Sequence, residues 1–216
     1  MIKIEKTEVL GWEHAIRGMR NPLNSWDKSD SGWFELEDWQ KADTGDTFGY
    51  EIGSNDLDLM KRLASAGSDH AKYRRMITVY ADVTAPLYWW KEYDTYKVGT
   101  VANSCSTMHK IADKAFTLSD FSCERLCKKA ICLLIELVTG LNEYRELYLE
   151  SKDKFYWWQM IQLLPSSYNQ RRTVQLNYEV LANMYHSRKS HKLDEWREFC
   201  EWVETLPYSE IITGGK

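Results

Sequence analysis

The chain has 216 residues, of which 44% are hydrophobic and 28% charged, with only 4 Pro and 11 Gly. That length can bury one sizeable core, and the composition excludes collagen-like, disordered and low-complexity proteins. The formal net charge is −4, so no basic surface predicts binding to nucleic acid or to an anionic membrane. Any phosphate-bearing ligand has to be held by a few well-placed donors.

No segment predicts insertion into a membrane or export. The most apolar run, 131–138, contains Glu136 and is far shorter than the roughly 20 residues of a membrane span. The opening residues, MIKIEKTEVL, alternate charged and apolar side chains, unlike a signal peptide. The 5 cysteines include no C-x-x-C pair, and Cys123, Cys127 and Cys132 follow helical spacing. We therefore expect a cytoplasmic protein with reduced thiols on a buried helix face and no metal site.

The first half of the chain predicts strands and helices separated by one long loop. Alternation of apolar residues favours strands over 2–10 and 76–83. The segment 27–55 is rich in Asp, Ser and Gly, and we expect an exposed, mobile loop there. A helix is predicted to begin at Asn55 as its N-cap and to stop at Gly67, and another to open at Pro86 and run through Lys91.

The second half predicts helices almost throughout. Apolar residues at spacings of three and four indicate helices over 122–148, with a break at Gly140, and over 155–163, 174–189 and 193–203. The polar segment 166–172 is predicted to be a turn or a ligand-binding loop. With no repeat and no linker, residues 1–216 are expected to form a single helix-rich α+β domain. Most of the 10 Trp side chains are expected in the core or at subunit contacts.

The segment 86–110 carries an unusual density of hydroxyl and amide side chains between two lysines. Lys97 and Lys110 flank the small polar residues Thr100, Asn103, Ser104, Ser106 and Thr107. Compact donors beside a cation suit a phosphate or the polar edge of a pyrimidine. The same pattern also fits a solvated turn followed by an ordinary helix N-cap, and the residues alone leave both interpretations open.

Other candidate groups are less specific. Cys105 with His109 four residues later has the spacing of a thiol and its base on a helix, but structural helices show it as often and no third orienting group is identifiable. A lone His70 suits either a ligand contact or a structural position. Asn177, Asn183 and Arg188 are predicted to lie along one stripe of a helix, where they either hold a ligand or form a solvated face. Walker, G-x-G-x-x-G and H-E-x-x-H motifs are absent from the sequence.

In their order, these residues resemble the flavin-dependent thymidylate synthases over roughly residues 55–200. The family has Leu-Pro, then Tyr-Thr, T-x-N-x-R, a further Asn and L-R before a Trp. This sequence has, in matching order, Leu164-Pro165, Tyr168, Thr173, Asn177, Asn183, Arg188 and Trp196. For the family's R-H-R-x-x-S-x-N-x-x-S-x-R-Y signature it has Thr95-Tyr96-Lys97 at R-H-R, and Asn103 and Ser106 at the Asn and second Ser after a one-residue shift. His70 resembles the His of G-H-x-S-P.

The sequence departs from the family pattern at the arginines. Only Lys97 keeps a charge from R-H-R, and Met108-His109 replace R-Y. Glu179 stands where T-x-N-x-R has Arg, and Ile161 stands where the family has Arg before Leu-Pro. Because Gln or Met does not replace the bidentate fork of an arginine, the resemblance implies the fold more strongly than the reaction.

The resemblance implies a small antiparallel sheet, a homotetramer with sites between subunits, and the conversion of dUMP to dTMP. FAD would be the cofactor, with NADPH and methylenetetrahydrofolate as co-substrates. Ser106 and Arg188 would be the catalytic residues and would contact the nucleotide, with Lys97 as the residual cation. His70, Lys97, Asn103, Asn177 and Asn183 would bind the cofactor. Two alternatives stay open: a catalytically degenerate protein on this fold that binds a nucleotide or flavin, and an unrelated helical interaction protein.

Overall fold

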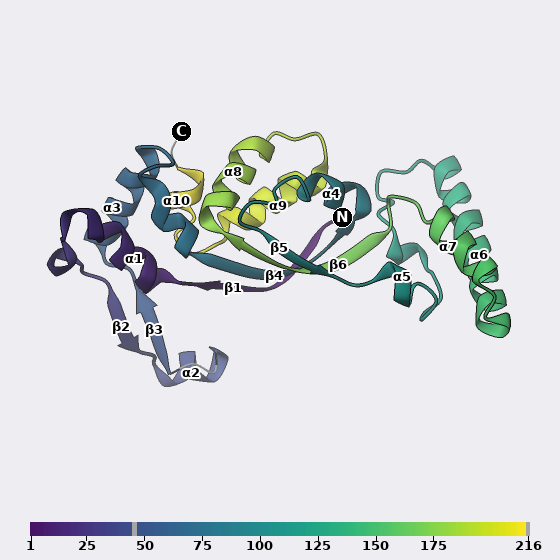
Figure 1. The fold of residues 1–216 in the computed structure, drawn as a ribbon, viewed down its shortest axis with the longest axis horizontal. Helices are drawn as coiled ribbons and strands as arrows, with labels where there is room; N and C mark the ends of the chain where they lie inside the picture. Colours follow the sequence, from purple (N-terminus) through teal and green to yellow (C-terminus); the bar gives the residue numbers. More distant parts are fainter. Residues whose placement is uncertain (45–46, 215–216) are drawn as a thin grey trace.

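A computed structural model describes residues 1–44 and 47–214 and gives an elongated molecule with a sheet across its middle (Figure 1). The strands are β1 (Lys3–Leu10), β2 (Gly32–Glu35), β3 (Phe48–Glu51), β4 (Thr78–Pro86), β5 (Val101–Ser104) and β6 (Asn169–Asn177). The helices are α1 (Trp12–Arg20), α2 (Asp38–Thr44), α3 (Ser54–Ser65), α4 (Leu87–Tyr93), α5 (Thr107–Lys110), α6 (Lys128–Ser151), α7 (Lys154–Leu163), α8 (Tyr178–Arg188), α9 (Asp194–Glu204) and α10 (Glu210–Thr213). Short 3-10 turns lie at Asn21–Leu23, Trp26–Lys28, Ala71–Met76 and Leu118–Asp120.

The main sheet has four strands in the order β1-β4-β6-β5, and every neighbouring pair is antiparallel. The longest pairing joins β4 to β6, from Thr78 opposite Asn177 to Pro86 opposite Asn169. The short strand β5 extends β6 on its outer edge, with Asn103 opposite Thr173. A mixed α+β fold with an antiparallel sheet is therefore confirmed.

The two faces of this sheet have different environments. In β4 the side chains of Val79, Ala81, Val83 and Ala85 are buried, and helices α4, α8 and α9 lie over that face (Figure 1). The alternate positions of β4 and β6 point the other way and carry polar side chains that are exposed or half-buried. Because side chains alternate along a strand, the sheet has one apolar face against the helices and one open polar face.

Two hydrophobic cores stabilise the fold. The larger one joins the apolar face of the sheet to the helices above it, and three of its fully buried side chains are Trp89, Trp90 and Trp196. The smaller one lies between α6 and α7, around Leu141 and Met160. The three buried tryptophan side chains confirm the core part of the tryptophan prediction, whereas Trp26, Trp33, Trp39 and Trp158 are exposed on the single chain, and subunit contacts for them stay a prediction.

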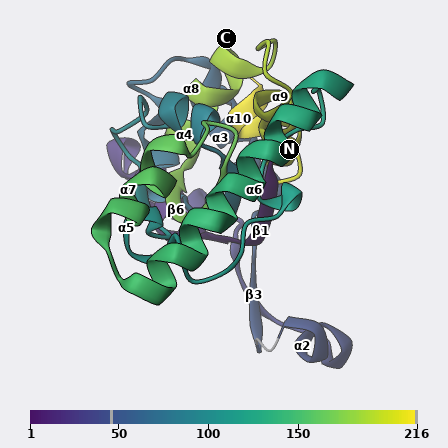
Figure 2. The ribbon, with the colours of Figure 1, turned by 90° about the vertical axis from the view of Figure 1, so that its right-hand side faces the viewer.

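Two parts project from the central body. The hairpin of β2 and β3, whose connecting segment contains α2, extends below the sheet in Figure 1. At the opposite end α6 and α7 pack against each other, and Figure 2 shows them side by side from outside. No helix among the described residues is long and apolar enough to cross a membrane.

Several predicted elements agree with the structure. Strands β1 and β4 and helices α4, α7 and α9 lie where the sequence predicts them, within a few residues. The α3 helix also forms, but it starts at Ser54 with Gly53 as its N-cap, so the predicted cap Asn55 lies inside its first turn. The chain turns just after α3 at Gly67, whose φ of 107° is in the left-handed region that favours glycine.

Other predictions were wrong. The predicted helix over 174–189 is strand β6 up to Asn177 and helix α8 only from Tyr178, and most of the predicted 166–172 loop belongs to the same strand. The predicted loop 27–55 contains β2, α2 and β3, with residues 45 and 46 outside the described part of the chain. Gly140 does not break α6. Helix α1, strand β5 and helix α10 were not predicted.

The cysteine prediction also needs correction. Cys123 precedes α6, Cys127 is its N-cap residue, and Cys132 is exposed within it. These three thiols do not form a buried helix face, and the buried cysteine is Cys200. Burial raises the pKa of the Cys200 thiol to about 11, so it stays protonated at neutral pH.

Candidate functional site

Ser106 lines a cavity of about 410 Å³ beside the end of strand β5. The strand pairing is extended by one residue here, because the Cys105 N–H donates to the Arg171 carbonyl at 2.9 Å. Ser106 then caps the short helix α5, and its hydroxyl oxygen accepts the His109 N–H at 3.1 Å. The serine O–H group remains able to donate to a ligand.

Three cations line the same cavity, and each is paired with a carboxylate. Lys110 pairs with Asp113 at 2.8 Å, Lys114 with Asp120, and Arg171 with Asp82 at 2.6 Å. The hydrogen bond that Lys110 donates to Asp113 is the main cause that raises the pKa of Lys110. The two lysine side chains are more than 70% exposed. Exposed ion pairs contribute only about 0–1 kcal/mol, so a doubly charged phosphate can compete for these cations.

The rest of the cavity wall suits a polar ring. Tyr168, Asn169 and Gln170 line it together with the hydroxyls of Thr84, Thr107 and Ser119. Burial is the main cause that raises the pKa of Tyr168, so its phenol stays a neutral donor at physiological pH. Ligand pockets of roughly 300–1,000 Å³ with a few convergent polar groups are typical of small-molecule sites.

Arg188, the last residue of α8, lies in a separate cluster with side chains from α4, α9 and the segment after α4. Its guanidinium donates to the Glu92 carboxylate at 2.6 Å and to the Tyr96 hydroxyl at 2.8 Å. The same group stacks over the Trp196 ring with its central carbon 4.8 Å from the ring centroid. Glu92 also accepts the Trp196 indole N–H at 3.1 Å. Arg188 is therefore held by groups of its own chain, and it does not line the Ser106 cavity.

Asn177 and Lys97 belong to neighbouring segments. Asn177 is the N-cap of α8, and its side-chain oxygen accepts the Val180 N–H at 2.9 Å. Gly99, two residues after the exposed Lys97, passes so close that a Cβ there would lie 2.9 Å from Asn177 Nδ2. Gly99 has a φ of 83°, so both its backbone conformation and this close contact require glycine. Asn177 thus has its amide nitrogen, but not its oxygen, to offer a ligand.

The remaining predicted residues are exposed. Asn103 lies on β5 opposite Thr173, in a row that continues across the sheet to Asp82 and Glu5. Asn183 is on the outer surface of α8. It is five residues from Arg188, or roughly 140° around the helix, so the predicted single stripe does not form. His70 is exposed in the turn after α3, where its N–H donates to the Gly67 carbonyl.

Asp82 on the open sheet face connects this row to the cavity. The Thr173 hydroxyl and the Arg171 guanidinium both donate to its carboxylate. The hydrogen bond from Thr173, followed by that from Arg171, lowers the pKa of Asp82. Asp82 is therefore ionised throughout the physiological range and fixes Arg171 at the edge of the cavity.

The predicted Cys105–His109 pair has no supporting contact. Cys105 is exposed at the cavity edge. Within residues 1–44 and 47–214, no hydrogen bond joins its thiol to His109, whose N–H is bound to Ser106 instead. Lys114, Ser119 and Asp120 were not predicted, because they reach the cavity only through the fold of the segment after α5.

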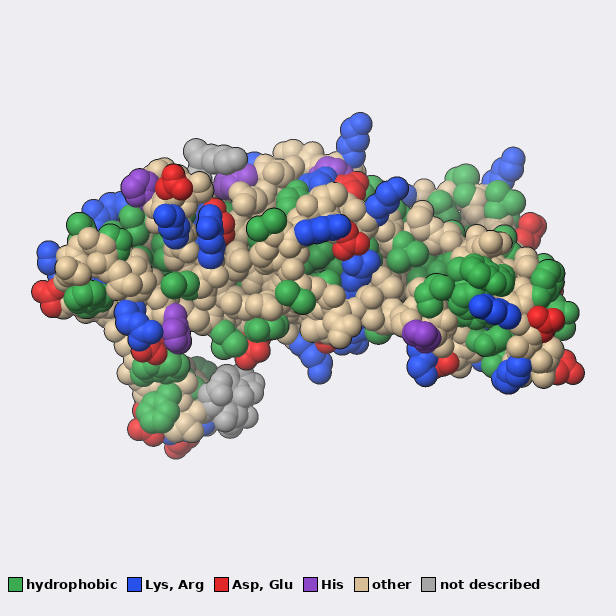
Figure 3. Space-filling model, in the orientation of Figure 1, with side chains coloured by type: hydrophobic (Ala, Val, Ile, Leu, Met, Phe, Trp, Pro, Cys, Tyr) green, Lys and Arg blue, Asp and Glu red, His purple; other side chains and the backbone are tan. Residues whose placement is uncertain are grey.

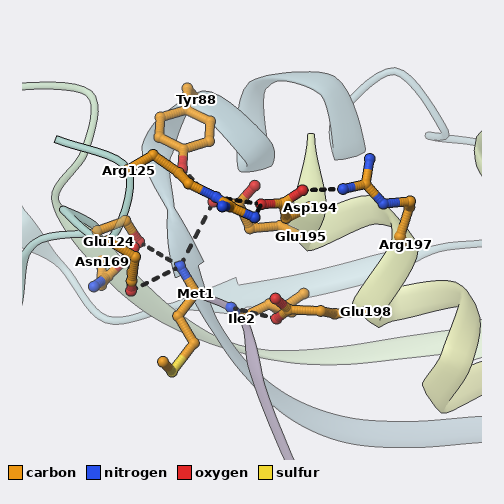
Figure 4. A network of polar contacts seen from close by, with 11 residues as sticks. Met1, Ile2, Tyr88, Glu124, Arg125, Asn169, Asp194, Glu195, Arg197 and Glu198 are labelled. Carbon is orange, nitrogen blue, oxygen red and sulfur yellow. Dashed lines mark hydrogen bonds and ion pairs between the residues drawn. The ribbon is translucent and has the colours of Figure 1, made fainter. Parts of the chain in front are cut away.

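A polar network near the first residues lines a further cavity, of about 540 Å³, which includes none of the predicted site residues. Figure 4 shows Arg125 donating to Asp194, which also pairs with Arg197, while Glu195 accepts the Tyr88 hydroxyl. Each of these carboxylates is neutralised by a partner in the same chain. The network joins the loop before α6 to the start of α9. A larger cavity of about 750 Å³ lies near α3. Its lining mixes lysine and arginine side chains with aspartates, and it includes none of the predicted site residues.

No protein-family model matches the sequence, and no curated protein is similar to it. The fold, however, is that of the flavin-dependent thymidylate synthases and related nucleotide methylases.

Thymidylate Synthase X from Helicobacter pylori, solved with FAD and dUMP, has a TM-score of 0.72 at 15% identity over 98% of this chain and 96% of its own. A second structure of the flavin-dependent enzyme from that organism, also with FAD and dUMP, has a TM-score of 0.67 at 15% identity, covering 97% and 96%. The UMP/dUMP methylase PolB from Streptomyces cacaoi, bound with 5-Br dUMP, has a TM-score of 0.62 at 13% identity, covering 100% and 96%. At these identities the similarity establishes the fold.

Proposed function

We propose that residues 1–216 form one functional domain that binds a pyrimidine nucleoside monophosphate in the Ser106 cavity and methylates its ring. The observation that carries the proposal is a cavity with three cations and several hydroxyls in a fold whose neighbours were solved with dUMP or 5-Br dUMP. The proposed reaction converts dUMP to dTMP, with methylenetetrahydrofolate as the one-carbon donor and reduced nicotinamide as the source of electrons.

The residues of this chain would act by position and charge. Lys110, Lys114 and Arg171 would exchange their carboxylate partners for the phosphate, which accepts stronger charge-assisted hydrogen bonds. Ser106 would donate its O–H to the nucleotide. Holding the ring in one orientation lowers the entropic part of the reaction barrier. Arg188 would contact the nucleotide only after leaving Glu92, so its predicted role requires a rearrangement.

The proposed cofactor, FAD, fits this chain less well than the nucleotide does. Once reduced by the nicotinamide, the flavin would supply the hydride that completes a methyl group. Of the residues that the resemblance assigns to flavin, only Lys97 is a lysine or an arginine, so a single side-chain cation would face the two negative charges of the FAD diphosphate. The Asn177 oxygen already accepts the Val180 N–H, which leaves the Asn177 amide nitrogen and the side chains of Asn103, Asn183 and His70. The residues assigned by resemblance therefore fit the FAD diphosphate less well than the Ser106 cavity, with its three cations, fits a phosphate.

A second candidate is a catalytically degenerate protein that binds the nucleotide without methylating it. The contact that favours it is the ion pair between Arg188 and Glu92, which occupies the guanidinium expected on the substrate. The replaced arginines at 161 and 179 support the same alternative. In both cases a cytoplasmic homo-oligomer, a tetramer by resemblance, remains part of the proposal.

Calorimetric titration with dUMP tests the nucleotide site. The Lys110→Gln/Lys114→Gln variant is expected to weaken binding at least about tenfold, since each charged contact to phosphate contributes about 1.5–3 kcal/mol. Ser106→Ala should weaken it by a smaller factor. The matched control Lys128→Gln removes an exposed lysine at the start of α6, and binding should stay within about twofold. Unchanged affinity in the double lysine variant rules out this cavity.

A visible absorption spectrum separates the two candidate functions. Desalted protein is mixed with FAD and then with dUMP, and a bound-flavin spectrum that shifts with the nucleotide supports the methylase. Nucleotide binding with no uptake of FAD supports the degenerate protein. Arg188→Ala adds a further test, because loss of nucleotide binding at an unchanged melting temperature supports a role at the site. Genetic rescue of a thymidine-requiring strain then tests turnover.

A further inference from the structure

The start of strand β6 forms one wall of the Ser106 cavity. Asn169 and Arg171 both line the cavity, and because they are two residues apart on a strand, their side chains point to the same face of the sheet. Figure 3 shows Lys, Arg, Asp and Glu side chains next to one another on the surface beside α5, where the charges suit a phosphate. Asn169 is a neutral group in the same cavity, so it is a candidate contact for the ring of a nucleotide.

The buried Ser122 fixes the orientation of the Asn169 amide. Its hydroxyl donates to Asn169 Oδ1 at 2.8 Å, and only 8% of Ser122 is exposed. The Ser122 N–H donates to the Ser167 carbonyl at 2.8 Å, and the preceding residue, Phe121, forms an antiparallel bridge with Tyr168. The serine is therefore held beside the start of β6 by its backbone. Its hydroxyl cannot turn away from Asn169 without losing a buried hydrogen bond.

This contact leaves the nitrogen of the Asn169 amide for the Ser106 cavity. Ser122 lines the neighbouring cavity of about 540 Å³, whereas Asn169 lines the Ser106 cavity, so the amide oxygen is turned toward the wall between the two. Among residues 1–44 and 47–214, no group of the chain accepts a hydrogen bond from Asn169 Nδ2. An amide nitrogen carries two N–H donors and no acceptor.

Two neighbouring side chains already use their acceptor atoms inside the chain. Gln170 has both ends of its amide occupied, since Nε2 donates to the Cys105 carbonyl and Oε1 accepts the Arg172 Nε–H, each at 3.0 Å. The Ser106 oxygen accepts the His109 N–H. The part of the wall around Asn169 therefore favours a ligand edge that carries acceptors.

Uracil and cytosine differ in that respect at one position of the ring. Uracil has the O4 carbonyl, an acceptor, where cytosine has the N4 amino group, a donor. An N–H of Asn169 can donate to O4, but it would face the N4 amino group donor to donor and leave both without a partner. A site that hydrogen-bonds its substrate rejects an analogue that leaves its own polar group unpaired.

We propose that Asn169 selects uracil over cytosine in the Ser106 cavity by donating to O4, and that Ser122 is the positioning residue that holds the amide in this orientation. Asn169 contacts the ring, whereas Ser122 acts only through Asn169. The inference deepens the proposed function and rests on it, because it requires that the cavity binds a pyrimidine nucleoside monophosphate.

Calorimetric titration with dUMP and with dCMP tests the selection, and the ratio of the two dissociation constants is the readout. The wild type is expected to bind dUMP at least about tenfold more tightly than dCMP. Asn169→Asp keeps the shape of the side chain but gives the N4 amino group an acceptor, so the preference should disappear or be reversed. The matched control Asn24→Asp changes an exposed amide that does not line the cavity, and its ratio should stay within about twofold of the wild type.

Ser122→Ala separates orientation from packing. Without the hydroxyl the Asn169 amide can turn, so the preference for dUMP should fall to about threefold or less while dUMP still binds. A serine that only supports the fold would weaken both nucleotides equally and leave the ratio unchanged. In protein labelled with [15N]asparagine, the side-chain Nδ2 signals that are missing from Asn169→Asp should shift when dUMP is added.

The outcomes distinguish this inference from the proposed function. Equal affinity of the wild type for dUMP and dCMP overturns the inference and leaves the nucleotide site standing. So does a ratio that is unchanged in Asn169→Asp or in Ser122→Ala, or an Asn169 signal that does not respond to dUMP. A wild type that binds neither nucleotide overturns the proposed function, and this inference with it.

Discussion

Two arginine–carboxylate pairs, each with a buried arginine, have very different surroundings in this chain. The Arg20 Nε–H donates to Asp56 Oδ1 at 2.6 Å. The other oxygen, Oδ2, accepts hydrogen bonds from the Ser29 and Ser31 hydroxyls. In the other pair, Arg74 Nη1 lies 3.6 Å from Glu179 Oε2. Two nitrogens of the Arg74 guanidinium and the paired oxygen of Glu179 are buried without a hydrogen-bond partner.

The difference bears on the most conspicuous departure from the flavin-dependent family. Glu179 stands where the resemblance expects an arginine for a ligand phosphate, and the structure pairs it with Arg74 inside the fold. The charge reversal is therefore compensated within the chain rather than directed at a ligand. A buried pair stabilises only when hydrogen bonds satisfy its remaining atoms. We accordingly expect the Asp56 network to be essential for folding and the Glu179 pair to be replaceable.

The largest expected effect is at Asp56. Asp56→Asn removes the negative charge and leaves Arg20 buried and uncompensated, which should lower the free energy of unfolding by about 3–5 kcal/mol. Urea denaturation followed by circular dichroism measures it. The matched control Asp58→Asn changes an exposed aspartate of the same helix and should stay within about 0.5 kcal/mol. Equal effects of the two substitutions would contradict a specific role for Asp56.

The prediction of the fold from sequence succeeded where local pattern and tertiary context agree. Strand β4 alternates apolar and polar side chains, and α7 repeats them at helical spacing, so both are visible locally. Strand β6 was not predicted, because the spacing of Val174, Leu181 and Met184 also fits a helix. The strand is fixed by hydrogen bonds to β4 on one side and β5 on the other, which no local pattern reports. The break predicted at Gly140 is absent, because α6 continues through it and the low helix propensity of one glycine does not end a long helix.

For the candidate site, sequence alone identified Ser106 and Lys110 but not their neighbours. Arg171 lies 65 residues after Ser106 and joins it through the pairing of β5 with β6. Arg188, the clearest motif residue, has its hydrogen bonds satisfied by Glu92 and Tyr96. Sequence order indicates which residues a fold family uses. It does not indicate which of these side chains already donate their hydrogen bonds to other groups of the same chain.

Acid should remove the advantage of the Asp56 network. Burial alone raises the pKa of the Asp56 carboxyl, but the serine and arginine hydrogen bonds outweigh it, so its folded-state pKa is lowered. A lowered folded pKa contributes stability above the unfolded value of about 3.9, and that contribution is lost as pH falls through the folded pKa. In urea titrations from pH 7 to pH 3, the difference between wild type and Asp56→Asn should shrink below about pH 4. A constant difference would show that the charge is not responsible.

A smaller loss is expected at one of the serines. The Ser31 hydroxyl donates to Asp56 at 2.7 Å and accepts the Gly53 N–H at 3.0 Å, just before α3. Ser31→Ala removes both bonds, and a hydrogen bond to a charged group contributes about 1.5–3 kcal/mol. The melting temperature should fall accordingly, with Ser54→Ala on the exposed first turn of α3 as the control. An unchanged melting temperature in Ser31→Ala would mean that the Asp56 carboxylate does not need the Ser31 hydroxyl in addition to that of Ser29.

The smallest effect should come from removing a whole pair. Arg74→Met/Glu179→Leu replaces both charges with apolar side chains of similar size, and the free energy of unfolding should change by less than about 1 kcal/mol or increase. Either single substitution should cost more than the double, because it leaves one buried charge without its partner. The corresponding Arg20→Met/Asp56→Leu protein should stay strongly destabilised, since Ser29, Ser31 and the Asp30 N–H lose their acceptor. If the two double variants lose the same free energy of unfolding, then the number of satisfied hydrogen bonds is not what distinguishes the two pairs. Glu179 would then have to be explained by a structural role equal to that of Asp56.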